Sequence, residues 1–194
     1  IVRERDPDVM LFVETDHWWE QRLDALEATH PYTVKCPKDN LYGMHLYSRL
    51  ELVDPELRFM VEPDVPSIHA QVRLRSGNCI ELHCVHPRPP APTESDTSIE
   101  RDAELLLVAK SVAASRSAAL VIGDLNDVAW SHTNDLFQSI SGLLDPRRGR
   151  GFFSTFNANW PFLRFPLDHA FSSRHFRLIN FKRLPHCESD HFPV

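Results

Sequence analysis

The spacing of hydrophobic and polar residues changes several times along the chain, and each change predicts a different element. Residues 9–13 form a short continuous apolar run, which is typical of a buried strand. Within residues 16–28, Trp19, Leu23 and Leu26 recur at helical intervals with charged residues between them. This stretch therefore predicts an amphipathic helix after the first strand.

The next part of the chain contains four short strand-like segments, at residues 43–50, 57–61, 68–74 and 79–85. Prolines at positions 55, 63 and 66 and the turn sequence Ser76-Gly77-Asn78 separate them. We therefore expect a series of antiparallel strands. Residues 86–92 contain four prolines, which exclude a helix or a central strand and predict a stiff loop.

Two helices and four strands are predicted in the second half. Residues 95–98 supply helix-start side chains, and residues 99–115 carry acids early, with Lys110 and Arg116 late, as the helix dipole favours. A second helix is expected at residues 130–140, with Ser131 as its candidate cap. Strands are expected at residues 118–122, 167–172, 176–184 and 191–194.

The order of these elements favours mixed sheets with helices packed outside them. A doubly wound parallel sheet would alternate strand and helix throughout, which this chain does not do. The chain has 194 residues, of which 42% are hydrophobic and 25% charged. These values are ordinary for a soluble globular protein, so we expect residues 1–194 to form a single domain.

Net charge, the length of the apolar runs and the cysteine spacing each argue against certain classes of protein. A net charge of -6 argues against a surface that is basic throughout, although a local basic patch is compatible with it. No apolar run approaches the ~20 residues that span a bilayer, and no signal-peptide pattern begins the chain. The cysteines, at positions 36, 79, 84 and 187, lack zinc-type spacing and are expected to be buried hydrophobic residues.

Polar residues that suit chemistry follow three of the predicted strands. Glu14 is either a cation ligand or the solvent-facing first residue of a loop. Asp124 and Asn126 lie two residues apart, so in extended geometry they point to one side. They suit a hard cation, a phosphate or an attacking water, or else an Asx-type turn. His86 enters the proline-rich loop, which would hold its imidazole at low entropic cost.

Two Asp-His pairs lie near the C-terminal end, Asp168-His169 and Asp190-His191. An aspartate within hydrogen-bond reach orients an imidazole and raises its basicity, which suits general acid or base catalysis. Since the chain has 11 histidines, such pairs also arise by chance.

Basic and aromatic residues gather around the first of these pairs. The basic ones would line a phosphate-rich groove or form a solvated loop, and they are Arg147, Arg148, Arg150, Arg164, Lys182 and Arg183. Trp160, Phe162 and Phe165 would stack on bases, contact lipid, or form a small hydrophobic cluster. DNA, RNA, phospholipid headgroups and small phosphate esters all remain open as substrates.

The ordered set of strand-end motifs resembles the endonuclease/exonuclease/phosphatase superfamily over nearly the whole chain. The motifs are E-T at 14–15, H-P at 86–87, G-D-L-N-D at 123–127, L-D-H-A-F at 167–171 and S-D-H at 189–191. G-D-L-N and S-D-H are the most specific. The resemblance implies an α/β fold of two packed, mixed and mainly antiparallel β-sheets flanked by helices, which is the four-layer DNase I-like sandwich.

The resemblance also implies a catalytic role for five residues. His191, oriented by Asp168, would be the acid or base at the phosphorus. Asp124 and Asn126 would position the attacking water and contact the phosphate, and His86 would contact phosphate oxygens. Sequence alone leaves open which group takes the proton of the water.

For the metal, the resemblance implies Mg²⁺ bound by Glu14, with Asp190 assisting, and Mn²⁺ as an alternative ion. A few carboxylates completed by water and substrate oxygens are what Mg²⁺ prefers. The groove candidates Arg148, Arg150 and Arg164 would contact a phosphate-ester substrate, such as a nucleic acid or a phospholipid. The oligomeric state is left open.

The sequence departs from the family pattern at its beginning. Members normally have an Asn at the end of a strand before the one that carries Glu14, and this sequence starts after that position. The last residues, S-D-H-F-P-V, also stop within a predicted strand, so we expect a domain cut from a longer protein at both ends and lacking the first strand. The longer run G-D-L-N-D-V-A-W-S resembles an uncharacterised bacterial subgroup, several members of which carry membrane-spanning segments ahead of the domain.

Two functional hypotheses follow. The first is a divalent-metal-dependent hydrolase of phosphate esters, such as a phosphodiesterase or nuclease. The alternative is a non-catalytic module on the same fold that binds a phosphorylated ligand or a protein partner. An unrelated hydrolase with a Ser-His-Asp triad is disfavoured, because the chain has no G-x-S-x-G motif.

Overall fold

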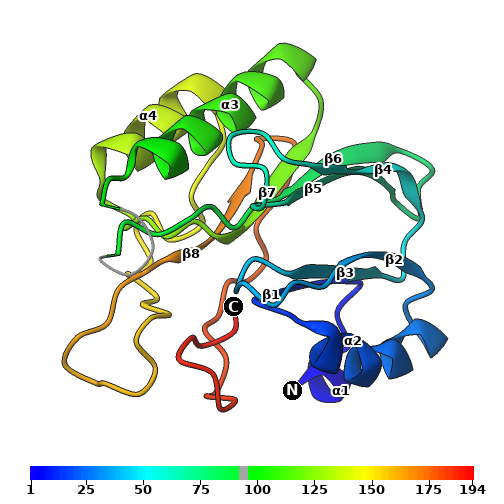
Figure 1. The fold of residues 1–194 in the computed structure, drawn as a ribbon. Helices are drawn as coiled ribbons and strands as arrows, with labels where there is room; N and C mark the ends of the chain where they lie inside the picture. Colours follow the sequence, from blue (N-terminus) through cyan, green and yellow to red (C-terminus); the bar gives the residue numbers. More distant parts are fainter. Residues whose placement is uncertain (92–95) are drawn as a thin grey trace.

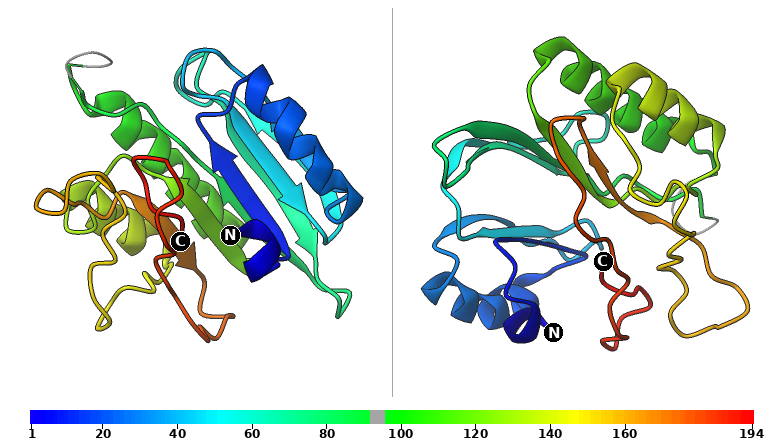
Figure 2. Two further views of the ribbon diagram at one scale, coloured as in Figure 1. Left: turned by 90° about the horizontal axis from the view of Figure 1, so that it is seen from below. Right: turned by 180° about the vertical axis from the view of Figure 1, so that it is seen from behind.

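The protein is described from a computed structural model, which describes residues 1–91 and 96–194. Two stacked sheets are covered by helices on both outer faces, so the molecule has four layers (Figure 1, Figure 2). The helices are α1 (Val2–Arg5) and α2 (His17–Leu23) on one face and α3 (Ile99–Ser115) and α4 (His132–Ser141) on the other. This confirms the expected sandwich of two packed, mainly antiparallel sheets flanked by helices. The end of the proline-rich loop, Pro92, and the helix-start residue Ser95 lie outside the described residues.

The larger sheet has five strands in the order β4-β5-β6-β7-β8. They are β4 (Leu52–Arg58), β5 (Ser67–Arg73), β6 (Cys79–Cys84), β7 (Ala119–Asp124) and β8 (Asp168–Ser172). Neighbouring strands are antiparallel except for β6 and β7. This parallel pair is joined by a crossover through α3, as parallel strands require. The carboxyl ends of β6 and β7 therefore lie at the same edge of the sheet.

The smaller sheet is antiparallel, in the order β1-β3-β2. Its strands are β1 (Val9–Val13), β2 (Tyr32–Cys36) and β3 (Met44–Ser48). Helix α2 begins at Asp16, whose side chain accepts a hydrogen bond from the backbone N–H of Trp19. It continues as the 3-10 helix η1 (Asp24–Ala28) and covers the outer face of this sheet, where Leu23 packs on Tyr47.

Alternation along the strands fills the space between the sheets with apolar side chains. Met44 and Leu46 of β3 meet Ile68 and Leu82 of the larger sheet, and all four are buried. Burying a side chain of this size stabilises the fold by roughly 1.5–3 kcal/mol. A second cluster, which includes Phe137 of α4, attaches the two long helices to the outer face of the larger sheet. The core thus fixes both sheets and leaves their ends to carry polar residues.

Several predicted boundaries need correction. Residues 176–184 and 191–194, all described, form loops where strands are predicted, apart from one bridge between Phe156 and His191. Beside the end of β8, Leu144 forms an isolated bridge with Ser172 instead. The strand predicted at 57–61 lies at 52–58 instead, and its proline occupies a bulge in an edge strand. Strand β2 is half exposed and is not predicted.

The helix predicted at residues 130–140 begins two residues later. Its cap is Ser131 as expected, because the hydroxyl accepts the backbone N–H of Asn134. All four cysteines are free, and only Cys84 is buried, so their expected burial is wrong for the other three. Among the described helices, none combines the length and the apolar character needed to cross a membrane.

Candidate active site

The register between β7 and β8 brings two carboxylates face to face. Asp124 is the last residue of β7, Asp168 is the first of β8, and the two are direct partners in the antiparallel pair. Directly opposed residues in such a pair point to the same face of the sheet. Like charges at this spacing repel, so the pair favours a proton or a cation between them.

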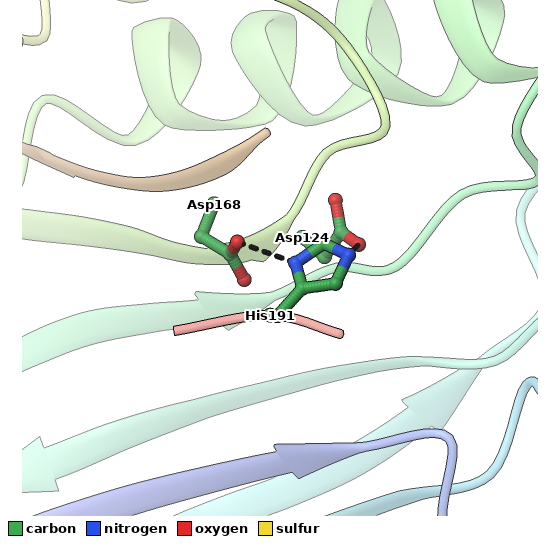
Figure 3. A group of neighbouring side chains, drawn as sticks. All are labelled: Asp124, Asp168 and His191. Carbon is green, nitrogen blue, oxygen red and sulfur yellow. Dashed lines mark hydrogen bonds and ion pairs between the residues drawn. The ribbon is translucent and has the colours of Figure 1, made fainter. Parts of the chain in front are cut away.

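His191 supplies that charge (Figure 3). Its Nδ1 lies 2.7 Å from Asp168 Oδ2, and its Nε2 lies 3.5 Å from Asp124 Oδ2. The imidazole thus connects the two carboxylates, and its ring packs against Phe156 at a centroid distance of 5.0 Å. The S-D-H motif contributes directly, because the backbone N–H of His191 donates to Ser189 Oγ.

Within the group formed by Asp168, His191 and Asp124, the pKa values of His191 and Asp124 are both raised. Burial opposes a charge on His191, but the hydrogen bond to Asp168 and the charges of Asp124, Asp168 and Asp190 outweigh it and raise its pKa to about 9. Burial and the charge of Asp168 raise the pKa of Asp124 to about 7. At neutral pH His191 is therefore an imidazolium, while Asp124 holds a proton more readily than an exposed carboxyl does.

Asp124 and Asn126 form a turn and a site at once. The backbone N–H of Asn126 donates to Asp124 Oδ1 at 2.9 Å, which closes an Asx turn. The side-chain amide of Asn126 donates to the carbonyl of Pro87 at 2.9 Å and so connects the turn to the loop after His86. The Asx turn expected as one alternative is therefore present, and the second oxygen of Asp124 faces His191.

The glycine of G-D-L-N is required by a close approach between strands. Gly123 has a φ of 146°, and a Cβ there would lie 1.9 Å from the carbonyl oxygen of Val85. Only glycine allows the end of β7 to run this close to the residues that follow β6. This approach brings the residues beyond both strands into one pocket.

A pocket of about 380 Å³ opens over these groups. The predicted site residues in its wall are Glu14, His86, Asp124, Asn126, Asp190 and His191. Asp168 lies behind the ring of His191. The structure therefore brings together all seven residues that the sequence nominated as catalytic or metal-binding. Leu41, Tyr42 and Phe156 contribute to the less polar part of the wall.

Glu14 reaches the pocket from the smaller sheet. It follows β1 with a φ of 58°, a left-handed conformation that costs a non-glycine residue on the order of 1 kcal/mol. Its Oε1 lies 4.0 Å from His86 Nε2. Burial lowers the pKa of His86 to about 4, with Asp168 opposing the shift, and no described residue hydrogen-bonds to its Nδ1. His86 is therefore neutral at physiological pH.

Three side chains here could hold a metal ion. Asp124, Asp168 and His191 each offer one ligand atom, and these atoms lie within 4.8 Å of one another. In the described part of the chain they are the group of His, Cys or acidic residues that meets this geometry. Glu14 and Asp190, the metal ligands nominated from sequence, lie on the wall of the same pocket but outside this tighter group.

The Asp168-His169 dipeptide divides between the two faces of β8. Asp168 contacts His191 on one face, whereas His169 is buried on the other, 2.5 Å from Arg147 Nη2 and 3.2 Å from the amide of Asn134. Burial and the charge of Arg147 lower the pKa of His169 to about 3. Arg147 itself is buried in an ion pair with Asp145, so it does not line a groove.

The remaining predicted groove residues lie in two places. Arg148 and Arg150 are exposed in the turn after Pro146 and are not part of the wall of the pocket. Arg164 lines a separate cavity together with Lys182 and Arg183.

Arg101 supports the site and is missed from the sequence. It lies in the first turn of α3, where its Nη1 donates to the carbonyl of Asn126 at 2.7 Å and its Nη2 lies 3.5 Å from Asp127. An arginine in a first turn opposes the helix dipole, which is a sequence signal for another partner. Asp127 accepts the Ser131 hydroxyl, and Ser131 caps α4.

Comparisons with known proteins bear on the family and the fold. The sequence profile of the endonuclease/exonuclease/phosphatase family matches residues 1–191. Comparison with curated proteins finds no match.

Several solved structures share the fold. D. rerio TDP2 complexed with a single-strand DNA product is 17% identical with a TM-score of 0.76, over 98% of this chain and 85% of that one. An endonuclease/exonuclease/phosphatase from Beutenbergia cavernae is 19% identical with a TM-score of 0.75, over 98% and 62%. The human Nocturnin catalytic domain with a bound sulfate anion is 17% identical with a TM-score of 0.68, over 90% and 72%.

Proposed function

The chain belongs to the endonuclease/exonuclease/phosphatase family, and we propose that it is a divalent-metal-dependent hydrolase of phosphate esters, specifically a phosphodiesterase or nuclease. The observation that carries this proposal is the hydrogen-bonded group Asp168-His191-Asp124, of which His191 and Asp124 line an acidic pocket. The DNA product in D. rerio TDP2 and the sulfate in Nocturnin support a substrate of this class. Residues 1–194 would act as a single catalytic domain.

The donor set fits a hard divalent cation. Glu14, Asp124 and Asp190 offer carboxylate oxygens in the pocket wall, and no cysteine lines it. Mg²⁺ prefers such a sparse oxygen set, completed by water and substrate. We assign Glu14 and Asp190 as its ligands, with Mn²⁺ as an alternative ion. When bound, the ion would neutralise charge on the non-bridging phosphate oxygens.

Asp124 is the proposed base. Hydrolysis forms a bond from a water oxygen to phosphorus and breaks the phosphorus bond to the leaving oxygen. Asp124 takes the proton of the water, because its carboxylate faces the pocket and a pKa near 7 suits a base at neutral pH. Asn126 and neutral His86 contact phosphate oxygens as uncharged hydrogen-bond donors.

His191 is the proposed acid. Asp168 holds its Nδ1, so Nε2 faces Asp124 and the pocket with a proton to donate to the leaving oxygen. After turnover Asp124 carries a proton and His191 lacks one. The 3.5 Å separation allows the proton to return, and a pKa of about 9 on His191 against about 7 on Asp124 drives it in that direction.

Hydrolysis of bis(p-nitrophenyl) phosphate tests this function. We expect p-nitrophenolate release with Mg²⁺ or Mn²⁺, loss of release with excess chelator, and recovery when metal is restored. Glu14→Gln should weaken Mn²⁺ binding in calorimetry by at least about tenfold. The control Glu56→Gln, an exposed change on edge strand β4, should leave binding and turnover unchanged.

Absence of metal binding, together with no hydrolysis of this ester or of plasmid DNA, would contradict the proposal. The non-catalytic binding module would then be the better account of the same pocket.

A further inference from the structure

The C-terminal quarter of the chain carries a charge opposite to that of the rest. The 49 residues from Pro146 onward contain eight Lys and Arg against three Asp and Glu, whereas the first 145 residues contain 13 against 24. The loops before and after β8, drawn in yellow to red, lie together at the end of the molecule away from α2 (Figure 1, Figure 2). An acidic protein therefore has one basic end.

A second cavity, of about 490 Å³, lies in these loops, and we call it the basic groove. Its lining consists of Phe153, Ser154, Arg164, Lys182 and Arg183. Three of these five residues are cations and none is acidic. In the described part of the chain, none of the three forms an ion pair. Neighbouring cations without a counter-charge repel one another, and an anion relieves that repulsion.

Two of the cations are held in position before any ligand arrives. Arg183 donates to the carbonyl of Ser154 at 2.8 Å and lies 4.3 Å from the ring centroid of Phe192. Arg164 donates to the carbonyl of Ala158 at 3.2 Å and lies 4.9 Å from the same ring. Fixed side chains lose less conformational entropy on binding, so the groove is organised for an anion.

The basic groove adjoins the proposed active site. Phe192, which contacts both guanidinium groups, follows His191 directly, and His191 bridges to Phe156. Phe153 lines the groove and Phe156 lines the first pocket. Three residues of backbone span at most about 11 Å. A nucleic-acid strand carries a phosphate every ~3.4 Å along a duplex axis, so this span corresponds to a few nucleotides.

We propose that the basic groove binds a substrate phosphate other than the one that is cleaved, and that the substrate is a nucleic-acid strand. This rests on the proposed function of the first pocket. A lipid with a single phosphodiester would occupy that pocket and leave the groove empty, whereas a strand supplies phosphates to both. Phe153 adds an aromatic ring to the groove lining, which suits base stacking.

A lipid surface is the competitor to be tested. Phe162 and Ile179, on the same loops, are 92% and 85% exposed, the highest values among large hydrophobic residues in the described part of the chain. The cations of the groove would then face anionic headgroups instead of a strand.

Fluorescence anisotropy with a fluorescein-labelled single-stranded oligodeoxynucleotide separates the two. With chelator present, the double substitution Lys182→Gln with Arg183→Gln should weaken binding and lower the slope of log affinity against log salt by roughly 2, because two side chains no longer neutralise phosphates. The matched control, Arg174→Gln with Arg177→Gln, removes two exposed cations from the same segment outside the groove lining. It should change the slope much less.

The single substitution Lys182→Gln provides a second variant that should fold normally, because Lys182 has no described hydrogen bond or ion pair to lose. It should lower the slope by roughly 1. Equal losses of affinity in the two double variants would overturn the proposal, since charge alone would then explain binding. Unchanged oligonucleotide binding, with weaker sedimentation on phosphatidylserine vesicles, would overturn it in favour of lipid.

Failure here is distinguishable from failure of the proposed function. Oligonucleotide binding is measured without turnover, and bis(p-nitrophenyl) phosphate has no second phosphate. The groove variants should therefore keep wild-type kcat/KM on that small ester. An enzyme that does not hydrolyse the ester at all would refute the catalytic proposal, and the binding result would still decide what occupies the groove.

Discussion

Two hydrogen-bonded networks of histidines and carboxylates lie on the larger sheet, and we call them the open chain and the closed chain. Only the open chain borders a described cavity. The closed chain crosses β5 and β6. Ser67 Oγ lies 2.9 Å from His69 Nε2, and His69 Nδ1 lies 2.7 Å from His83 Nδ1. His83 Nε2 lies 3.4 Å from Glu81. The open chain joins Asp168 to His191 and Asp124 at the edge of the same sheet.

One neutral arrangement of protons satisfies the closed chain. His83 Nε2–H donates to Glu81, His69 Nδ1–H donates to His83, and the Ser67 hydroxyl donates to His69. An added proton would break a link in a buried place. Burial, the nearby imidazole of His83 and the charge of Arg58 lower the pKa of His69 to about 3, and burial also lowers the pKa of His83.

The ratio of carboxylates to rings separates the two chains. The closed chain has one carboxylate for two imidazoles, and both imidazoles stay neutral. The open chain has two carboxylates for one imidazole, and the pKa of His191 rises to about 9 although its side chain is only 20% exposed. The same residue types thus give a structural link in one place and a charged acid in the other.

Removing the ring of the open chain should have the largest effect. His191→Gln keeps a polar side chain but loses the proton donor, so kcat on bis(p-nitrophenyl) phosphate should fall by about 10³-fold. His69→Gln makes the same change in the closed chain and should leave kcat near wild type. Similar losses of kcat in both variants would mean that the two chains do not differ in function.

The second-largest effect on kcat should come from removing one of the two carboxylates of the open chain. Asp168→Asn removes the charge that orients Nδ1, so kcat should fall by roughly 10²-fold. The pKa of His191 should also move down from about 9, because Asp168 contributes both a hydrogen bond and a charge. The pH dependence of kcat should show this shift in its basic limb. An unmoved limb would show that Asp168 acts through packing alone.

Much of the open chain could be predicted from the sequence because local signals specify it. Apolar runs mark where β1, β6 and β7 end, and polar residues after buried strands lie at sheet edges. The glycine of G-D-L-N permits the close approach at Val85. The register of β7 and β8 then places Asp124 opposite Asp168. The order of the motifs implies that these residues are close, but it does not give the distance between them.

The closed chain could not be predicted, because it depends on long-range register. His69 and His83 are opposite each other only when β5 and β6 pair as they do, 14 residues apart. The inward turn of Arg147 likewise depends on Asp145 and His169, which lie on different elements. Residues 176–184 have strand periodicity but form no strand in the structure, because periodicity alone does not specify a pairing partner.

The pH dependence of stability should separate the two chains by sign. The folded pKa of His69 lies below its unfolded value of about 6.5, so its contribution is present above pH 6.5 and is lost as pH falls toward 3. The folded pKa of His191 lies above that value, so its contribution is present below pH 6.5 and is lost as pH rises through 9.

Urea unfolding of each variant against wild type measures these contributions, and other titrating groups such as Glu104 cancel in the difference. The stability gap between wild type and His69→Gln should shrink by on the order of 2 kcal/mol between pH 6.5 and 5. The gap for His191→Gln should shrink between pH 6.5 and 9. If the difference in unfolding free energy between wild type and variant changed in the same direction with rising pH for both variants, the two chains would not differ in this property.

The smallest effect should come from the far end of the closed chain. Ser67 is fully buried, and its hydroxyl lies 2.9 Å from His69 Nε2 and 3.3 Å from the carbonyl oxygen of Arg58. Ser67→Ala leaves that nitrogen without its donor, which should lower the free energy of unfolding by about 1–2 kcal/mol. Because this chain does not reach the pocket, kcat on bis(p-nitrophenyl) phosphate should stay at the wild-type value. Loss of kcat in a stably folded Ser67→Ala protein would show that the closed chain supports catalysis after all.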